Sequence, residues 1–272
     1  MRVEDLPVVD VRGALTEQRG RLVELLGSLD DAQWAAPTAA APWTVKDVAL
    51  HLVDVDISWV ARNRDGETAG LVPVSSSHEE FVQGLAQRNQ RWVDGTRPLS
   101  PRLITSVLQW AGDQLDAYLG TIDLAVPSSV YWAGQVPLWF DLIREFTERW
   151  VHYWQIREAS RPGRNDCQHD EYLPLVVRTF VWGFPHQYRA AAPAGTTVAV
   201  DITDIGAWTL TRDETGWTLD EGLSPMPVAG VRMTGDAAWR MLTGTRYDAR
   251  QISLSGERSL AQPLLDVRGI IV

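Results

Sequence analysis

The sequence predicts an α plus α+β fold, in which a bundle of helices is followed by a small domain of strands and helices. Through most of the first 160 residues, apolar side chains recur every three to four positions, which is the spacing of amphipathic helices. After residue 170, several short runs alternate apolar and polar residues, as half-buried strands do. The stretch 161–169 changes to Pro, Gly, Asn and Asp. We therefore expect two domains, over residues 1–162 and 170–272.

The first domain is predicted to be an antiparallel bundle of four or five helices. Its first helix covers about residues 9–30, where leucines recur with helical spacing. Thr44 stands where the N-cap of a second helix belongs, and this helix should end near Arg64. The segment 66–77, rich in Gly, Val, Pro and Ser, is expected to be a loop. The remaining elements are helices over 78–93, 100–119 and 138–159, with a break at Gly95 and Pro98 and a loop over 124–137.

The second domain is predicted to begin with a helix over about residues 171–191. Strands are expected where the sequence reads TTVAVDIT, AWTLTR and GWTLDE, with a hairpin turn at DETG between the last two. Asp236 is placed to cap a short helix over AAWRMLTG. QISLSG is predicted to be a further strand, and RSLAQPLLDVRGI a closing helix.

The composition limits the classes of partner. The chain has 35 acidic and 25 basic residues, a net charge of −10, and no cluster of Lys or Arg, which argues against nucleic acid or an anionic membrane as the partner. No uninterrupted apolar stretch is long enough to span a bilayer, and no secretory signal is predicted. The single cysteine, Cys167, fits a reducing compartment. We expect a cytoplasmic protein, a monomer or small homo-oligomer, that acts on a small molecule.

Three residues of the predicted bundle could hold a metal ion. Glu148 and His152 are four residues apart on the last helix, so their side chains leave the same face, about 5–6 Å apart. His51 lies between Val48 and Leu52, close to the face that turns toward the interior. Bundle cores hold metals on such residues, and two histidines with one carboxylate can leave coordination positions free. The spacing leaves a second interpretation open, in which His51 is a core-edge histidine and the other two form a surface pair.

The segments APWTVKDVALHLVDVD and EFTERWVHYWQIREA carry a resemblance to a known family. The first resembles the second helix of the DinB-like and mycothiol-dependent maleylpyruvate isomerase family, in which a Trp-Ser/Thr-Val-x-Asp-Val opening leads to a metal-binding histidine. The second resembles the last bundle helix of that family, where a Glu-x-x-x-His pair completes the site. The resemblance implies a DinB-like four-helix bundle followed by an α+β domain. It also implies His51, Glu148 and His152 as the metal ligands, with zinc as the expected ion and iron or nickel as alternatives.

Two features depart from the family pattern. The family helix commonly continues His-x-x-Asp-Ile-Arg, whereas Gln155 stands where that aspartate would be. If the aspartate supports a ligand in relatives, a neutral amide changes how the metal is tuned. The isomerase also uses an arginine of its C-terminal domain on the carboxylates of its substrate. No motif selects one here, and the candidates include Arg232, Arg240 and Arg246.

A metal with open positions can bind a thiol and generate a nucleophilic thiolate at neutral pH. Because the chain has no plausible nucleophile of its own, a low-molecular-weight thiol is the natural supplier, and the resemblance implies mycothiol. The thiolate can add reversibly to a cis-enedioic acid such as maleylpyruvate, giving cis/trans isomerisation, or stay attached to an electrophile as a thiol S-transferase would leave it. Two alternatives stay open: a metal-dependent hydrolase and a non-catalytic small-molecule-binding protein.

The 13 tryptophans are an unusual number for this length. Mycothiol is largely a neutral pseudo-disaccharide, and sugars are bound by aromatic faces and hydroxyl hydrogen bonds. Trp59 lies two turns beyond His51 on the same predicted helix, and Trp150 and Trp154 flank His152. These three tryptophans are predicted to line the thiol site, although core packing explains most tryptophans of a bundle.

Overall fold

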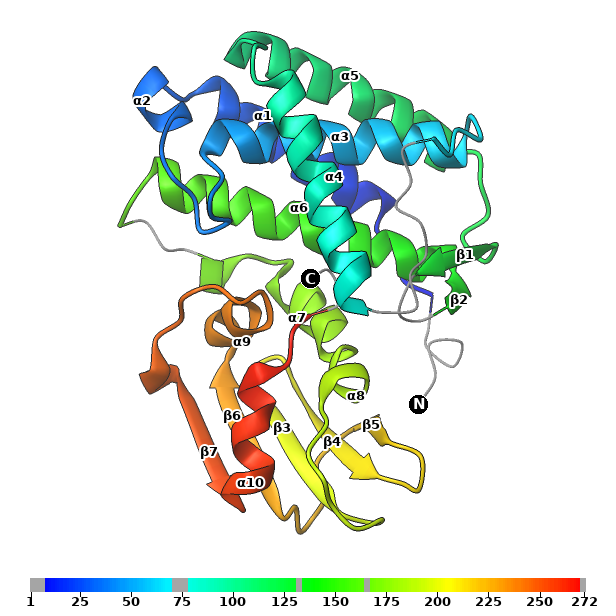
Figure 1. Cartoon of the computed structure of the whole chain (residues 1–272), viewed down its shortest axis with the longest axis vertical. Helices are drawn as coiled ribbons and strands as arrows, with labels where there is room; N and C mark the ends of the chain where they lie inside the picture. Colours follow the sequence, from blue (N-terminus) through cyan, green and yellow to red (C-terminus); the bar gives the residue numbers. More distant parts are fainter. Residues whose placement is uncertain (1–7, 70–77, 131–133, 164–166, 270–272) are drawn as a thin grey trace. The chain divides into compact units, whose positions relative to one another are not determined.

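A computed structural model describes residues 8–69, 78–130, 134–163 and 167–269 of the chain. The chain divides into two compact units, the first over Val8–Asn165 and the second containing residues 166–272 (Figure 1). Within these described ranges, no helix combines the length and the apolar content needed to span a lipid bilayer. The predicted fold class, helices followed by an α+β unit, is confirmed.

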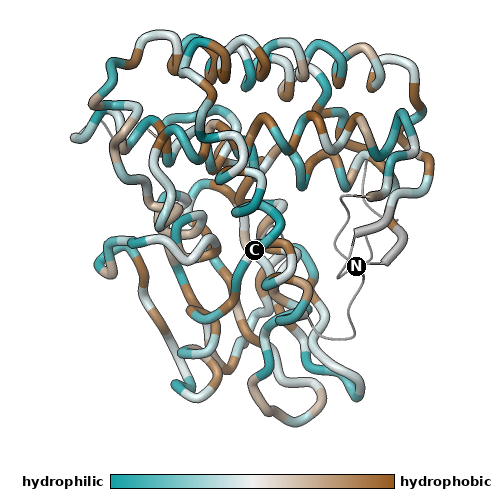
Figure 2. The backbone as a smooth tube through the Cα atoms, turned by 45° about the horizontal axis from the view of Figure 1, so that its top comes forward, coloured by the Kyte–Doolittle hydropathy of each residue, from teal (hydrophilic) through white to brown (hydrophobic). Residues whose placement is uncertain are grey.

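Long helices dominate the first unit. They are α1 (Arg12–Gly27), α3 (Val45–Asn63), α4 (His78–Thr96), α5 (Pro101–Leu119) and α6 (Leu138–Ser160), with a short α2 (Asp31–Trp34) between the first two. Helix α3 packs against α4, α5 and α6, and α1 packs against α5 and α6. Hydrophobic and hydrophilic residues alternate along these helices, as expected for helices with one buried face (Figure 2).

A capping box begins α3. The Thr44 hydroxyl accepts the backbone N–H of Asp47 at 3.3 Å, and the Asp47 carboxylate accepts the backbone N–H of Thr44 at 3.1 Å. These bonds satisfy two of the backbone N–H groups that a helix leaves free at its start. The prediction of Thr44 as the N-cap is confirmed. Because His51 lies less than two turns further on, this cap also fixes where its side chain leaves the helix.

Replacing Thr44 by Ala should lower the free energy of unfolding by about 1 kcal/mol, because the start of α3 loses its side-chain cap. Urea denaturation of the metal-free protein measures this effect. Thr44→Ser is the matched control, because it keeps the hydroxyl and should stay close to the wild type. Equal losses in the two variants would contradict a capping role.

Two parts of the first unit differ from the prediction. Helix α4 continues through Gly95 to Thr96, where the Thr96 hydroxyl donates to the Trp92 carbonyl at 2.7 Å and so closes the last turn. The segment 124–137 was expected to be a loop, but it contains a hairpin of β1 (Pro127–Val130) and β2 (Gly134–Pro137). Its strands are four residues each, too short to show an alternation in sequence. In the expected loop 66–77, residues 70–77 lie outside the described residues.

The second unit is built on a five-stranded sheet in the order β5-β4-β3-β6-β7, in which only the β3–β6 pair is parallel. Helix α9 packs on β3 and β6, and α10 packs on β6 and β7. The strands are β3 (Thr197–Thr203), β4 (Gly206–Arg212), β5 (Trp217–Glu221), β6 (Ala229–Thr234) and β7 (Ile252–Gly256). The helices are α7 (Leu173–Val181), α8 (Phe184–Gln187), α9 (Gly235–Leu242) and α10 (Arg258–Ala261).

Four of the five strands and the DETG turn follow the prediction. In that turn the Asp213 carboxylate accepts the backbone N–H groups of Thr215 and Gly216, both at 2.7 Å, which fixes the hairpin. Strand β6 was not predicted, because Ala229 and Gly230 begin it without a strand-forming side chain.

The helices of the second unit are shorter than predicted. The helix expected over 171–191 breaks into α7 and α8 at Gly183, where a Cβ atom would lie 2.5 Å from the Arg268 carbonyl oxygen. The N-cap of α9 is Thr234, not Asp236, whose carboxylate accepts instead from Arg240 at 3.1 Å. The expected closing helix is the short α10 followed by a 3₁₀ turn over Gln262–Asp266.

Candidate metal centre

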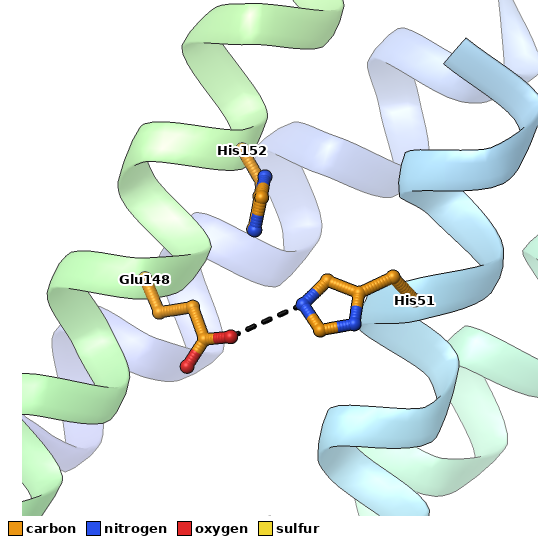
Figure 3. Close-up of side chains that lie close together, drawn as sticks. All are labelled: His51, Glu148 and His152. Carbon is orange, nitrogen blue, oxygen red and sulfur yellow. Dashed lines mark hydrogen bonds and ion pairs between the residues drawn. The ribbon is translucent and has the colours of Figure 1, made fainter. Parts of the chain in front are cut away.

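His51, Glu148 and His152 converge in the first unit (Figure 3). His51 comes from α3, and the other two lie one turn apart on α6, which packs against α3. Each residue offers one ligand atom, and these atoms all lie within 4.8 Å of one another. His51 Nε2 is 3.1 Å from Glu148 Oε1, and the two imidazole rings have centroids 5.0 Å apart. Glu148 and His152 thus lie on one face of α6, and α3 brings His51 opposite them. Two imidazole nitrogens and a carboxylate meet there.

The surroundings of the two histidines differ. His51 is buried, and the ring of Trp43 packs against its ring at a centroid distance of 5.1 Å. Glu148 and His152 are only partly buried. His152 donates from Nδ1 to the side-chain oxygen of Gln155 at 2.8 Å. Among the described residues, His51 Nδ1 has no hydrogen-bond partner.

The protonation states at neutral pH suit a metal. Burial alone would raise the pKa of the Glu148 carboxyl, but the hydrogen bond from His51 and the charges of His51 and Arg144 hold this pKa well below its usual range. Burial, and after it the nearby His51, lower the pKa of His152 to about 4 against the opposite effect of Glu148. Glu148 is therefore ionised and His152 neutral, which are the forms that coordinate a cation.

We expect the metal-free protein to lose stability as the pH falls from 6.5 to about 4. In this window the unfolded chain binds a proton at His152 and the folded chain does not, so stability rises with pH, by up to about 1.4 kcal/mol per pH unit. The lowered pKa of Glu148 acts in the same direction. Urea denaturation across this window measures the slope. His152→Asn should flatten it, and an unchanged slope would contradict the assignment.

A network of buried charges surrounds the cluster. Arg149 binds Asp56 of α3 at 2.7 Å and Glu145 of α6 at 2.9 Å, and so joins the two helices that carry the cluster. Arg144 contacts Glu145 and approaches the second oxygen of Glu148 at 3.9 Å. Burial would lower the pKa of each arginine, but these carboxylates raise both pKa values above the usual range.

The network carries more negative than positive charge. It consists of Arg19, Arg144 and Arg149 with Asp56, Asp116, Asp141, Glu145 and Glu148. Among the described residues, these three guanidinium groups and five carboxylates give a formal charge of −2 when the histidines are neutral. Asp116 and Glu148 are partly exposed, at 28% and 20%, but charge held largely away from water is costly unless it is balanced. A cation of charge +2 held by His51, Glu148 and His152 would balance it.

The three tryptophans predicted to line a thiol site are in the core. Trp59, Trp150 and Trp154 are 3%, 0% and 3% exposed. Trp59 packs against Tyr118, and the ring centroids of Trp150 and Trp154 are 6.1 Å apart. In this arrangement they present no open face to a sugar, which fits the core-packing alternative.

The candidate arginines of the second unit differ in their surroundings. Arg240 is bound to Asp236 and lies over the Trp239 ring at 4.4 Å. Arg232 is exposed beside Asp201, at 3.5 Å, and Arg246 is exposed. These contacts do not select one of the three as a substrate ligand.

Sequence reasoning missed the neighbours of the cluster. Trp43 belongs to the quoted WTVKDV segment, but its contact with His51 depends on how the chain turns into α3. No pattern in the sequence indicated that Arg149 joins the two helices, because its partner Asp56 lies on a different helix. Gln155 was noted only as a departure from the family pattern, although three residues along a helix from His152 is a contact distance.

The chain thus has a helical bundle with a His/Glu cluster, followed in the sequence by an α+β unit. The family model described as "Mycothiol maleylpyruvate isomerase N-terminal domain" matches residues 15–157, which is more than half of the chain. The chain belongs to this family, and the family predicted from sequence is confirmed.

Solved structures agree on the fold. The crystal structure of the mycothiol-dependent maleylpyruvate isomerase is similar with a TM-score of 0.55 and 16% sequence identity, over 94% of this chain and 97% of that chain. A histidine-to-alanine mutant of the mycothiol-dependent maleylpyruvate isomerase gives a TM-score of 0.54 at the same identity and coverage. At 16% identity the likeness establishes the fold alone. No curated protein matches the sequence.

Proposed function

We propose that the protein is a divalent-metal-dependent enzyme of the cytoplasm that uses mycothiol as the nucleophile toward a small electrophile. It acts as a thiol S-transferase or as a cis/trans isomerase of a compound such as maleylpyruvate. The observation that carries the proposal is the convergence of His51, Glu148 and His152 within 4.8 Å in a member of this family. The name of the matched family supports mycothiol as the thiol.

The residues present fit a metal in three respects. Two imidazoles and one carboxylate are a donor set that zinc accepts, and iron and nickel accept it as well. The ionised Glu148 and the neutral His152 need no proton change before they coordinate. The charge of −2 on the surrounding network favours a divalent cation over none. We propose zinc as the first choice.

Three protein ligands leave room for a further donor. A bound divalent metal supplies a Lewis acid that lowers the pKa of a coordinated thiol and so provides a thiolate at neutral pH. The chain's own residues hold and orient that ion. Cys167 is buried, so we do not assign it the role of nucleophile. The thiol therefore comes from outside the chain.

Thiol binding tests the proposal. Calorimetry with mycothiol, glutathione and cysteine, each on metal-loaded and metal-free protein, should give strong binding only for mycothiol on the metal-loaded form. The expected selectivity follows because the sulfur supplies the metal ligand, while the sugar contacts distinguish mycothiol from the other two. Equal binding of all three thiols without metal, or no binding at all, would contradict it. Turnover of an electrophile without thiol would favour hydrolysis instead.

A further inference from the structure

The two histidines of the candidate centre are held by different contacts. His152 has one ring nitrogen in a hydrogen bond, from Nδ1 to Gln155 Oε1 at 2.8 Å. In the described part of the chain, His51 Nδ1 is buried without a partner, and its Nε2 faces Glu148. Among the described residues, only His152 of the two therefore has a hydrogen-bond partner on its Nδ1, whereas the His51 ring is held by its contacts with Trp43 and Glu148.

The bond to Gln155 determines which nitrogen of His152 is free. An amide oxygen can only accept, so Nδ1 must carry the proton. A neutral imidazole has one N–H group, so Nε2 keeps its lone pair. In Figure 3 one ring nitrogen of His152 points toward Glu148 and His51, and the other lies on the side of its own helix. The nitrogen bonded to Gln155, three residues further along α6, is the second of these.

We propose that Gln155 is a positioning residue of the candidate metal centre, whose amide oxygen holds His152 in the Nδ1–H tautomer and directs its Nε2 lone pair at the site. That His152 is a metal ligand rests on the proposed function. That Gln155 orients its ring rests on the hydrogen bond between them. Gln155 is 4% exposed, so water does not replace the acceptor. Loss of the amide would leave the Nδ1–H group unsatisfied and the ring free to adopt the other tautomer.

The neutral amide gives a sharp test, because Gln155→Glu is nearly isosteric and changes only the charge of the acceptor. A carboxylate behind a ligating histidine makes the imidazole a stronger donor. Gln155→Glu should therefore bind Zn²⁺ at least as tightly as the wild type. Gln155→Leu should bind Zn²⁺ about 10- to 100-fold more weakly, which is the usual effect of losing such a contact.

The tautomer can be read without metal. Long-range ¹H–¹⁵N correlation spectra of the metal-free protein should show His152 protonated at Nδ1 in the wild type and in Gln155→Glu. In Gln155→Leu the signal should shift toward the Nε2–H tautomer or a mixture. Gln18→Leu is the matched control: Gln18 is a glutamine of α1, 2% exposed, whose amide contacts no polar partner in the described residues. It should change neither the tautomer nor the Zn²⁺ affinity.

The two readouts separate this inference from the proposed function. A wild-type His152 protonated at Nε2, or a Gln155→Leu variant with an unchanged tautomer, would overturn the positioning role. If Gln155→Leu does not fold, weaker Zn²⁺ binding by the isosteric Gln155→Glu would overturn it as well. A wild type that takes up no divalent metal, yet shows the Nδ1–H tautomer and loses it in Gln155→Leu, would overturn the proposed function and leave the positioning of His152 intact.

Discussion

Replacing His152 by Ala is expected to reduce the bound divalent metal from about one equivalent per chain to trace levels, because one of three protein ligands is lost. His51→Ala should have the same effect. Glu148→Gln should weaken binding less, because the amide oxygen remains in place as a neutral donor. The helices should stay folded, since Ala is at least as good a helix former as His.

Equilibrium dialysis against Zn²⁺ followed by elemental analysis measures the occupancy, and circular dichroism measures the helix content. His186→Ala in the second unit is the control, because this histidine is outside the cluster and its loss should leave the occupancy unchanged. Full occupancy in all three cluster variants would show that the convergence of these residues does not hold a metal.

Arg149→Met is expected to lower the free energy of unfolding of the metal-free protein by about 3–5 kcal/mol. Arg149 is 8% exposed, and its guanidinium group binds Asp56 and Glu145. Methionine fills a similar volume, but it removes the arginine that two buried carboxylates share, and only Arg19 and Arg144 remain beside them. This loss of buried counter-charge is what makes the effect large. Urea denaturation at pH 7 gives the value.

An exposed ion pair supplies the control for this variant. Arg250 pairs with Asp248 at 2.7 Å, but its side chain is 90% exposed, so Arg250→Met should change stability little. The loss in Arg149→Met should also shrink at acidic pH, because protonation neutralises the two carboxylates from which the substitution removes a positive charge. Similar effects of the two substitutions at pH 7 would mean that the Arg149 network does not stabilise the bundle.

Local signals in the sequence predicted the long helices. Thr44 and Ser100 each accept a backbone N–H at a helix start, and a cap of this kind depends only on residues within one turn. The hairpin β1–β2 and strand β6 were missed, because short strands depend on partners that the sequence does not place beside them. The helix predicted over 171–191 likewise breaks at Gly183 because the backbone of Arg268, 85 residues later in the sequence, comes close to it.

The candidate site was predictable in part. The pair Glu148 and His152 follows from helical spacing, whereas the addition of His51 relied on the resemblance to a family. The charges around them come from α1, α3, α5 and α6, so no stretch of sequence contains them. The sequence also could not predict that Trp59 is buried, because tryptophan is used both in apolar cores and in binding sites.

The 97-residue separation between His51 and Glu148 affects how the protein is made. While the chain is being synthesised, His51 emerges early and has neither of its companions. Helix α6 carries Glu148 and His152, so a nascent chain that ends before α6 has only His51. The three ligand atoms meet only when that late helix docks on α3, a contact distant in sequence and therefore slow to form. The complete set of three ligands therefore exists only after α6 has been made and has docked on α3.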